Sequence, residues 1–318
     1  MPIESGRSAE GDLLWVVNPF SGVVTYLTDI HLKANGFRAG GAVPAGGEFD
    51  LASLQAACSF CPGNEALTTE EVLRHPDHTH GPWQLRAFYN LLPRIPVECT
   101  GGRNESYVVV ETPSHFRSDA AHPDHLFYSA MLAPAEFRSL VRAAAAISRI
   151  AFDNPSIRSV VVRKNQGRDS GASQPHPHTQ VIGADRVVPP IAREREILAR
   201  DPATFRAMVE LADREGFTIA ERDGCHLYFS PFGVFPRCYE VVDLSASGRL
   251  FEIDAERLDC FADMLHQALV LLGDLPLDYE IHADPHLPLH AHVHARHYPY
   301  SNIAGTLNLP TGILRQRS

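Results

Sequence analysis

The sequence predicts an α+β fold built from two fused halves, each an antiparallel sheet with packed helices. Runs rich in β-branched residues alternate with long amphipathic stretches, which is typical of this class. Each half ends with a long helix, a strand, and a strand that carries alternating histidines, HPHTQ at 176–180 and HVHAR at 292–296. A chain of 318 residues, 44% of them hydrophobic, can form one large domain or two smaller ones. We place the two halves at 1–188 and 189–318.

The first half begins with two predicted strands within 13–27, separated by an Asn-Pro turn at 18–22. The Gly/Ala-rich segment 35–47 and the segment 58–64 are predicted loops. The clearest helix covers 135–152, where apolar residues recur on one face and a proline precedes the first turn. Further strands of this half are predicted at 83–90, 106–111, 158–163 and around 181–182.

The second half repeats this plan. Residues 190–214 are predicted to be helical, with a break at Asp201-Pro202 because proline cannot continue a helix. A second long helix is predicted at 254–272. The strands of this half are predicted at 225–230, 237–242, 277–283 and 289–298. The repeated order indicates an internal duplication.

Composition excludes several classes of protein. No apolar run approaches the roughly 20 residues of a membrane-spanning helix, and the polar N-terminus does not resemble a secretory signal, so we expect a cytoplasmic protein without a membrane partner. The formal net charge of −10 lacks any concentrated block of Lys or Arg, which argues against a nucleic-acid partner. Six cysteines in such a protein favour metal ligation over disulfides.

The strongest motif is GASQPHPHTQ at 171–180. In an extended segment, residues two apart face the same way, so His176, His178 and Gln180 would project into one site. The small residues upstream let backbone amides approach a phosphate. A neutral imidazole is a competent nucleophile toward phosphorus, and a covalent intermediate divides a two-substrate exchange into two easier steps. An exposed histidine pair or a simple metal site is the alternative, which the Gly/Ser loop and the glutamine disfavour.

The second motif is Cys58-Ser-Phe-Cys61 followed by Pro-Gly. This spacing suits one half of a tetrahedral zinc site, and the lack of a second CxxC means that the other ligands should be histidines. A redox dithiol is the alternative, but it would need a buried strand before the motif. The remaining cysteines are expected to be buried thiols: Cys99, Cys225, Cys238 and Cys260.

The third signal is a cluster of histidines near the C-terminus, at positions 282, 286, 290, 292, 294 and 297. On a strand, His290, His292 and His294 share one face. Such a face could hold a second metal or line a phosphate site. A solvated polar strand is the simpler alternative.

In these residues the chain resembles galactose-1-phosphate uridylyltransferases, a branch of the histidine-triad superfamily. The similarity runs through most of the chain. In the first half it is carried by NPFSG at 18–22, CSFCPGNE at 58–65, residues 83–90, VETPSH at 110–115, and 164–180. In the second half it is carried by SPF at 230–232, HADP at 282–285, 292–299 and IAG at 303–305.

The resemblance implies two histidine-triad-like halves and a role for each matching residue. His178 would attack the α-phosphorus, and Gln180 would donate to the α-phosphate and to the covalent intermediate. Four residues match a zinc site: Cys58, Cys61, His115 and His176. Four more match positions that contact the phosphates or the nucleoside: Asn90, Asn165, Gly171 and Ser173.

Some members of that family carry a second divalent metal, Fe or Zn, on one glutamate and three histidines. The nearest matches are Glu196, His282, His292 and His294, although the pair His290/His292 also matches the family's paired histidines. The chain departs from the family at both segments that select the substrate. It has only Lys33 and Arg38 where an arginine-rich segment is usual, and 304–312 matches the hexose-contacting stretch poorly.

The resemblance therefore predicts a homodimeric hexose-1-phosphate uridylyltransferase that exchanges a nucleotide sugar and a sugar phosphate by a ping-pong mechanism. Three alternatives stay open. A nucleotide-sugar or dinucleotide phosphorylase would use inorganic phosphate as acceptor. A hydrolase is disfavoured by Gln180, because hydrolytic relatives have histidine at that position. A metal- or nucleotide-binding protein without activity would use the same scaffold.

Overall fold

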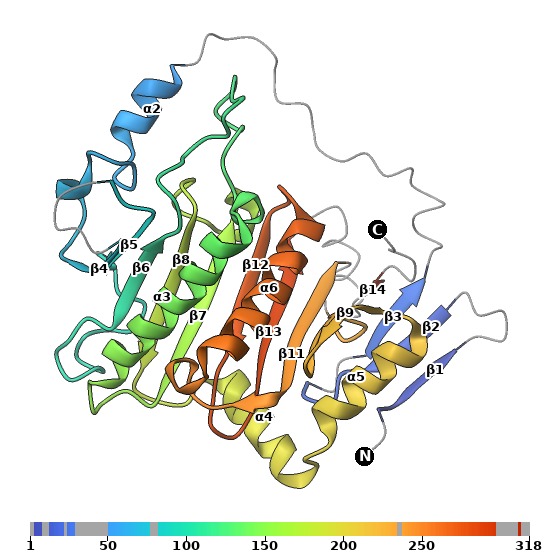
Figure 1. Cartoon of the computed structure of the whole chain (residues 1–318). Helices are drawn as coiled ribbons and strands as arrows, with labels where there is room; N and C mark the ends of the chain where they lie inside the picture. The colour runs from blue at the N-terminus through green and yellow to red at the C-terminus, as the bar shows by residue number, and fades with distance from the viewer. Residues whose placement is uncertain are drawn as a thin grey trace.

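The computed structural model describes most of the chain, at residues 3–7, 13–21, 24–28, 50–76, 82–233, 237–296 and 311–312. A broad sheet runs across the molecule, two long helices cross one of its faces, and a smaller sheet lies to one side (Figure 1). The predicted α+β class, with a large antiparallel sheet and packed helices, is confirmed.

The large sheet has ten strands among the described residues, and all neighbours in it are antiparallel. From edge to edge the strands are β4 (Glu71–His75), β5 (Leu85–Tyr89), β6 (Ser106–Val110), β8 (His178–Ala184), β7 (Ser159–Gln166), β12 (Leu277–His282), β13 (Pro288–Ala295), β11 (Cys238–Ser247), β10 (Cys225–Phe229) and β9 (Thr218–Arg222). Because β7 and β12 pair at the centre, the histidine-bearing strands β8 and β13 each lie next to a central strand.

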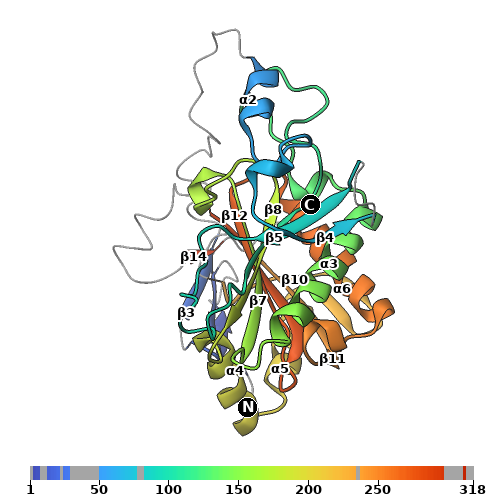
Figure 2. The same ribbon diagram turned by 90° about the vertical axis from the view of Figure 1, so that its left-hand side faces the viewer.

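Helices α3 (Pro134–Phe152) and α6 (Ala255–Leu272) cover one face of this sheet (Figure 2). The apolar stripe of α3 is buried as predicted, including Phe137, Leu140 and Ile147. α6 begins after Asp254, whose side chain accepts a hydrogen bond from the backbone of Arg257 and caps the helix. We call the opposite face of the large sheet the histidine face, because it carries the alternating histidines of β8 and β13.

The predicted break at Asp201-Pro202 separates α4 (Pro189–Arg200) from α5 (Thr204–Glu215), which ends at Gly216 in the left-handed conformation. α5 packs against β9, β10 and β11. The helix α2 (Leu51–Ala57) is capped by Asp50 and leads into the CxxC loop. The described residues also form four short 3₁₀ helices: η1 (Glu65–Leu67), η2 (Ser129–Met131), η3 (Arg168–Ser170) and η4 (Leu250–Glu252).

The small sheet contains β1 (Ser5–Arg7), β2 (Leu13–Val17), β3 (Val24–Thr28) and β14 (Thr311–Gly312). The predicted turn between β2 and β3 is held by Asn18, whose Oδ1 accepts from the backbone of Phe20 and Ser21. Its Nδ2 donates to the carbonyl of Phe232, which ties this turn to the loop after β10.

Most predicted elements match the structure within a few residues, but several were missed. Strands β1, β4 and β9 and the helix α2 had no strong apolar period, because edge strands and surface helices bury little. Cys225, Cys238 and Cys260 are buried as expected, whereas the expectation for Cys99 is wrong because it is exposed. The predicted loop 35–47 lies outside the described residues. No helix among the described residues is long and apolar enough to cross a membrane.

Candidate active site

His178 is the first residue of β8, and its ring is buried at the edge of the histidine face. Its Nδ1 lies 2.9 Å from the carbonyl oxygen of His176. Because a carbonyl can only accept, Nδ1 must carry the proton, and the neutral ring then keeps a free lone pair on Nε2. Burial lowers the pKa of His178, and the charge of Lys164 lowers it further, so the neutral form is favoured.

His176 turns toward the two cysteines. Its Nε2 donates to the carbonyl of Thr112 at 2.8 Å, so that Nδ1 points at the sulfur atoms of Cys58 and Cys61, 3.9 and 3.6 Å away. Nδ1 of His115 lies 3.3 Å from the sulfur of Cys61. All four residues are buried, and their donor atoms lie within 4.8 Å of one another. Two thiols and two imidazoles at this spacing fit a tetrahedral zinc ion.

The loop between the cysteines also contacts His178. The ring of Phe60 meets the rings of His178 and Phe88 edge-on, with 5.4 Å between centroids in both pairs. Arg86 is completely buried and donates to the carbonyl of Ser59 in the same loop. The CxxC loop is therefore held against β5 and β8, and Phe60 forms one wall beside the ring of His178.

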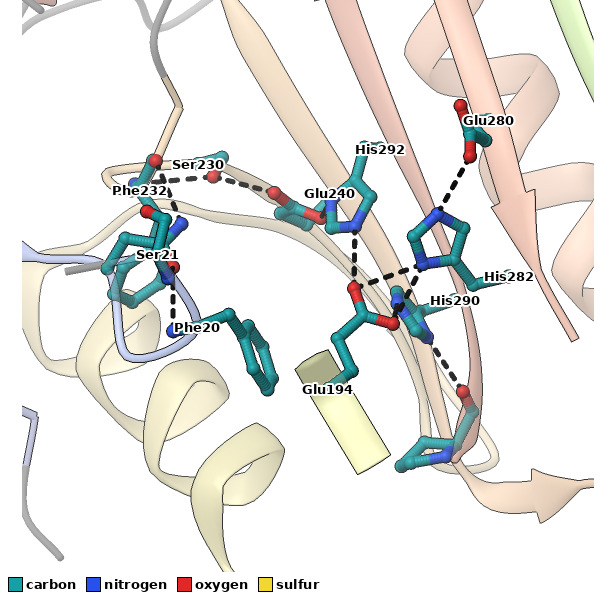
Figure 3. A network of polar contacts seen from close by, with 12 residues as sticks. Phe20, Ser21, Glu194, Ser230, Phe232, Glu240, Glu280, His282, His290 and His292 are labelled. Atoms are coloured by element: carbon teal, nitrogen blue, oxygen red, sulfur yellow. Dashed lines mark hydrogen bonds and ion pairs between the residues drawn. The ribbon is translucent and has the colours of Figure 1, made fainter. Parts of the chain in front are cut away.

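A second cluster lies between α4 and the histidine face, on β12 and β13 (Figure 3). An oxygen of the Glu194 carboxylate lies 2.9 Å from Nδ1 of His282. The carboxylate also lies 3.4 Å from Nε2 of His290 and 3.6 Å from Nε2 of His292. The four residues each offer one possible metal-ligand atom, and these atoms all lie within 4.8 Å of one another. Glu240 of β11 contacts the other ring nitrogen of His292 at 2.5 Å. One carboxylate and three imidazoles fit a divalent transition metal.

The charges of this cluster support one another. Burial alone would raise the pKa of Glu194, but the charge of His290 and the hydrogen bonds of the three histidines lower it well below its usual range. Burial opposes the charged form of His292, but Glu240 and Glu194 raise the pKa of this ring well above its ordinary value. Glu194, His282 and His292 therefore stabilise one another by hydrogen bonds and opposite charges, whereas burial lowers the pKa of His290 and its Nε2 has no hydrogen-bond partner among the described residues.

Two residues expected at the second site lie elsewhere. Glu196 is exposed on α4 and pairs with Arg193 and Arg200, while Glu194 occupies the position facing the histidines. Residues two apart on a helix point about 200° apart, so only one of the two acids can face inward. His294 lies further along β13, opposite Asp278 of β12, and the third histidine of the cluster is His290.

Of the residues expected to contact phosphates, Asn165 lines the same cavity as His178, and Gly171 and Ser173 lie in the loop that Asn165 contacts. Asn165 of β7 donates from Nδ2 to the carbonyl of Ser170 at 2.6 Å, which ties it to the loop that contains Gly171 and Ser173. Gly171 has a φ of +85°, a conformation that glycine adopts without strain. Segments 124–128, 164–167 and 174–178, together with Arg117 and Asp274, line a cavity of about 290 Å³ that includes His178 and Asn165.

Gln180 and Asn90 lie further from the reacting ring. Gln180 shares the histidine face with His178, and its buried Oε1 has no hydrogen-bond partner among the described residues. The backbone N–H of Asn90 donates to the carbonyl of Ser106, which pairs with Ile182, four residues along β8 from His178. At about 3.3 Å per residue, this places Asn90 roughly 13 Å along the sheet from His178.

A buried polar network lies beneath the motif, on the helix-covered face. Nζ of Lys164 donates to Glu111 at 2.8 Å and to the carbonyl of His178 at 3.2 Å. Glu111 also accepts hydrogen bonds from Thr179 and Ser129. The network fixes the backbone of His178 from the side opposite its ring.

Residues 99–298 match the family described as "Domain of unknown function (DUF4921)", which is more than half of the chain. The chain belongs to this family. It is also 27% identical over 250 residues to "ADP-glucose phosphorylase" from Arabidopsis thaliana, and this match covers 72% of the chain and 68% of the relative.

Solved structures share the fold at lower identity. An ADP-glucose phosphorylase from Arabidopsis thaliana with bound ADP-glucose superposes with a TM-score of 0.69 at 19% identity, covering 96% of this chain and 98% of that chain. A structure of uridylyltransferase gives a TM-score of 0.59 at 20% identity and covers 93% and 92% of the two chains. The expected likeness to the fold of galactose-1-phosphate uridylyltransferases is therefore confirmed.

Sequence reasoning missed several residues of the site. Glu194 could have been found, because it lies three residues after Ile191 and four before Leu198, on the apolar stripe of α4. Phe60 was visible as the large apolar residue between the cysteines. Lys164 and Glu111 lie 53 positions apart in the sequence, so no local sequence pattern indicates that they pair.

Proposed function

We propose that this chain is a nucleotide-sugar phosphorylase that works through a covalent nucleotidyl group on Nε2 of His178. The observation that carries the proposal is the bond from Nδ1 of His178 to the carbonyl of His176, which leaves Nε2 unprotonated. Similarity to a relative named ADP-glucose phosphorylase favours inorganic phosphate as acceptor over the sugar phosphate that the sequence first suggested.

The reaction consists of two displacements at one phosphorus. Nε2 of His178 attacks the α-phosphorus of the nucleotide sugar, the bond to the β-phosphate oxygen breaks, and the sugar 1-phosphate leaves. An oxygen of inorganic phosphate then attacks the same phosphorus, the N–P bond breaks, and a nucleoside diphosphate is released with the ring restored. The amide of Gln180 and the backbone N–H groups near Gly171 would stabilise the charge on the phosphoryl oxygens.

Zinc would be held by the four residues that the sequence suggested: Cys58, Cys61, His115 and His176. A closed set of four protein ligands makes the ion structural. The ion would fix the ring of His176, which lies just before β8. It would thereby also fix the backbone carbonyl of His176, which orients the ring of His178. A second divalent metal, Fe or Zn, would be held by Glu194, His282, His290 and His292.

We further propose that the halves 1–188 and 189–318 are duplicated histidine-triad-like units. Read from the two edges of the large sheet toward its centre, the strand orders are β4-β5-β6-β8-β7 and β9-β10-β11-β13-β12, which follow the same sequence of connections. α3 and α6 occupy the same place in both, after the third strand. Residue 188 falls between β8 and α4.

Adduct formation tests the nucleophile. The purified protein is incubated with a panel of nucleotide sugars without acceptor, and its intact mass is measured. We expect an increment of one nucleoside monophosphate, absent from His178→Ala and retained in the control His75→Ala, which changes an exposed histidine at the end of the edge strand β4. A wild-type increment on His178→Ala would refute the nucleophile.

The acceptor distinguishes the remaining candidates. The isolated adduct is mixed with phosphate, with sugar 1-phosphates or with buffer. Discharge by phosphate supports the phosphorylase, discharge by a sugar 1-phosphate supports the uridylyltransferase-like reaction, and equally rapid discharge in buffer supports a hydrolase. The homodimer expected from the resemblance stays a prediction, which sedimentation analysis would test.

A further inference from the structure

A cation on β7 faces the same side of the sheet as the nucleophile. Arg163 pairs with Gln180 of β8 on one side and with Glu280 of β12 on the other, so its side chain lies on the histidine face. In the described strands β6, β7, β8 and β12, it is the one Lys or Arg on this face. Lys164 points to the other face, where it binds Glu111.

The guanidinium of Arg163 is held by Asn165 and makes no direct ion pair among the described residues, although the carboxylate of Glu280 lies within electrostatic range of it. Its Nη2 donates to Oδ1 of Asn165 at 3.1 Å, whereas its buried Nε has no hydrogen-bond partner among the described residues. Glu280, the acid opposite it on β12, is directed to His282 at 3.2 Å. The buried Oε1 of Gln180 is also unpartnered in the described part of the chain. Buried polar atoms of this kind normally have partners, so they indicate space for a polar ligand.

The bond to Asn165 directs this guanidinium toward the reacting ring. β7 and β8 run antiparallel, so the chain after Arg163 leads to the end of the sheet at which β8 begins with His178. Asn165 also binds the carbonyl of Ser170, at the start of the small-residue loop. Arg163, Asn165 and this loop are therefore linked by hydrogen bonds on the strand next to β8, toward the end at which β8 begins with His178.

We propose that Arg163 binds the phosphate group that is exchanged at His178. In the first displacement this is the β-phosphate of the nucleotide sugar, and in the second it is inorganic phosphate. The inference rests on the proposed function. Both groups occupy the position opposite Nε2 in an in-line displacement, so one anion subsite serves both half-reactions. The guanidinium carries a planar fork of N–H donors that matches phosphate oxygens.

The experiment uses the isolated nucleotidyl adduct, prepared with the donor that labels the wild-type protein best. The rate of its discharge is measured against the concentration of inorganic phosphate. We expect Arg163→Met to need about tenfold or more phosphate for half-maximal discharge, since it loses a charge-assisted contact. Arg163→Lys keeps the charge without the fork of donors, so its phosphate concentration for half-maximal discharge should lie between those of wild type and Arg163→Met. Arg158→Met removes an exposed arginine that precedes β7 and should behave as wild type.

Two results would overturn the inference. One is a wild-type dependence on phosphate in both Arg163 variants. The other is a weaker binding of the donor nucleotide with unchanged phosphate saturation, which would place Arg163 at the base or ribose. In either case the wild-type adduct would still support the proposed function. If the wild-type protein forms no adduct with any donor, the proposed function and this inference both fail.

Discussion

Replacing Lys164 by methionine should cost about 3–5 kcal/mol of unfolding free energy, because it leaves the carboxylate of Glu111 buried without its countercharge. Both side chains are almost completely buried, with 2% and 0% of their surface exposed. The change removes the contacts of Nζ with Glu111 at 2.8 Å and with the carbonyl of His178 at 3.2 Å. The double variant Lys164→Met/Glu111→Gln should recover about 2 kcal/mol, since the amide is neutral and its single oxygen still accepts from one of the two hydroxyls, Thr179 or Ser129.

Equilibrium unfolding in urea measures these differences, with the fluorescence of the buried Trp83 as the signal. Arg200→Met is the control, because its ion pair with Glu196 is exposed and should contribute at most about 1 kcal/mol. Lys164 lowers the pKa of Glu111 against the effect of burial. The deficit of Lys164→Met should therefore shrink as the pH falls, because protonation removes the uncompensated charge. A single variant that loses less than about 1 kcal/mol, or a double variant no better than the single, would refute this account.

Three further predictions concern the metals and acid stability. Cys61→Ser should lose zinc and unfold at a lower temperature, whereas the exposed Cys99→Ser should keep both values, as metal analysis and calorimetry would report. Glu194→Gln should remove the metal of the second cluster while Glu196→Gln retains it, and equal metal content in the two variants would exclude Glu194 as a ligand. Burial lowers the pKa of His266, so the unfolded chain takes up its proton first and stability falls as the pH drops below about 6.5. His266→Leu should lose less unfolding free energy than wild type between about pH 7 and pH 5.5, and an unchanged loss would contradict this assignment.

The position of His178 on its strand and the grouping of Cys58 with Cys61 could be predicted because their signals are local. The order His-Pro-His-Thr-Gln places alternate side chains on one face of a strand whatever the rest of the fold does. The spacing of Cys58 and Cys61 likewise brings two sulfur atoms together within one loop. The resemblance to a family then supplied His115, which lies 54 residues away from Cys61 and has no local signal of its own.

The second cluster could be predicted only in part, because its membership depends on how α4 packs against the sheet. The run Arg193-Glu194-Arg195-Glu196 alternates charges, and either acid could face inward until Ile191 fixes the buried side. Arg163 was equally hidden. Its face is set by pairing with strands on both sides, one of which lies more than 110 residues further along the chain.

The central pairing of β7 with β12 sets the distance between the two clusters. Its ladder runs from Leu277 opposite Gln166 to Ile281 opposite Val162, and the two clusters lie on either side of it. A slip by one residue would turn every side chain of one half to the wrong face, so the smallest tolerable slip is two residues, or about 6.6 Å. Backbone hydrogen bonds thus allow the spacing between the two clusters to change only in steps of two residues. Substitutions in surface loops should leave this spacing unchanged.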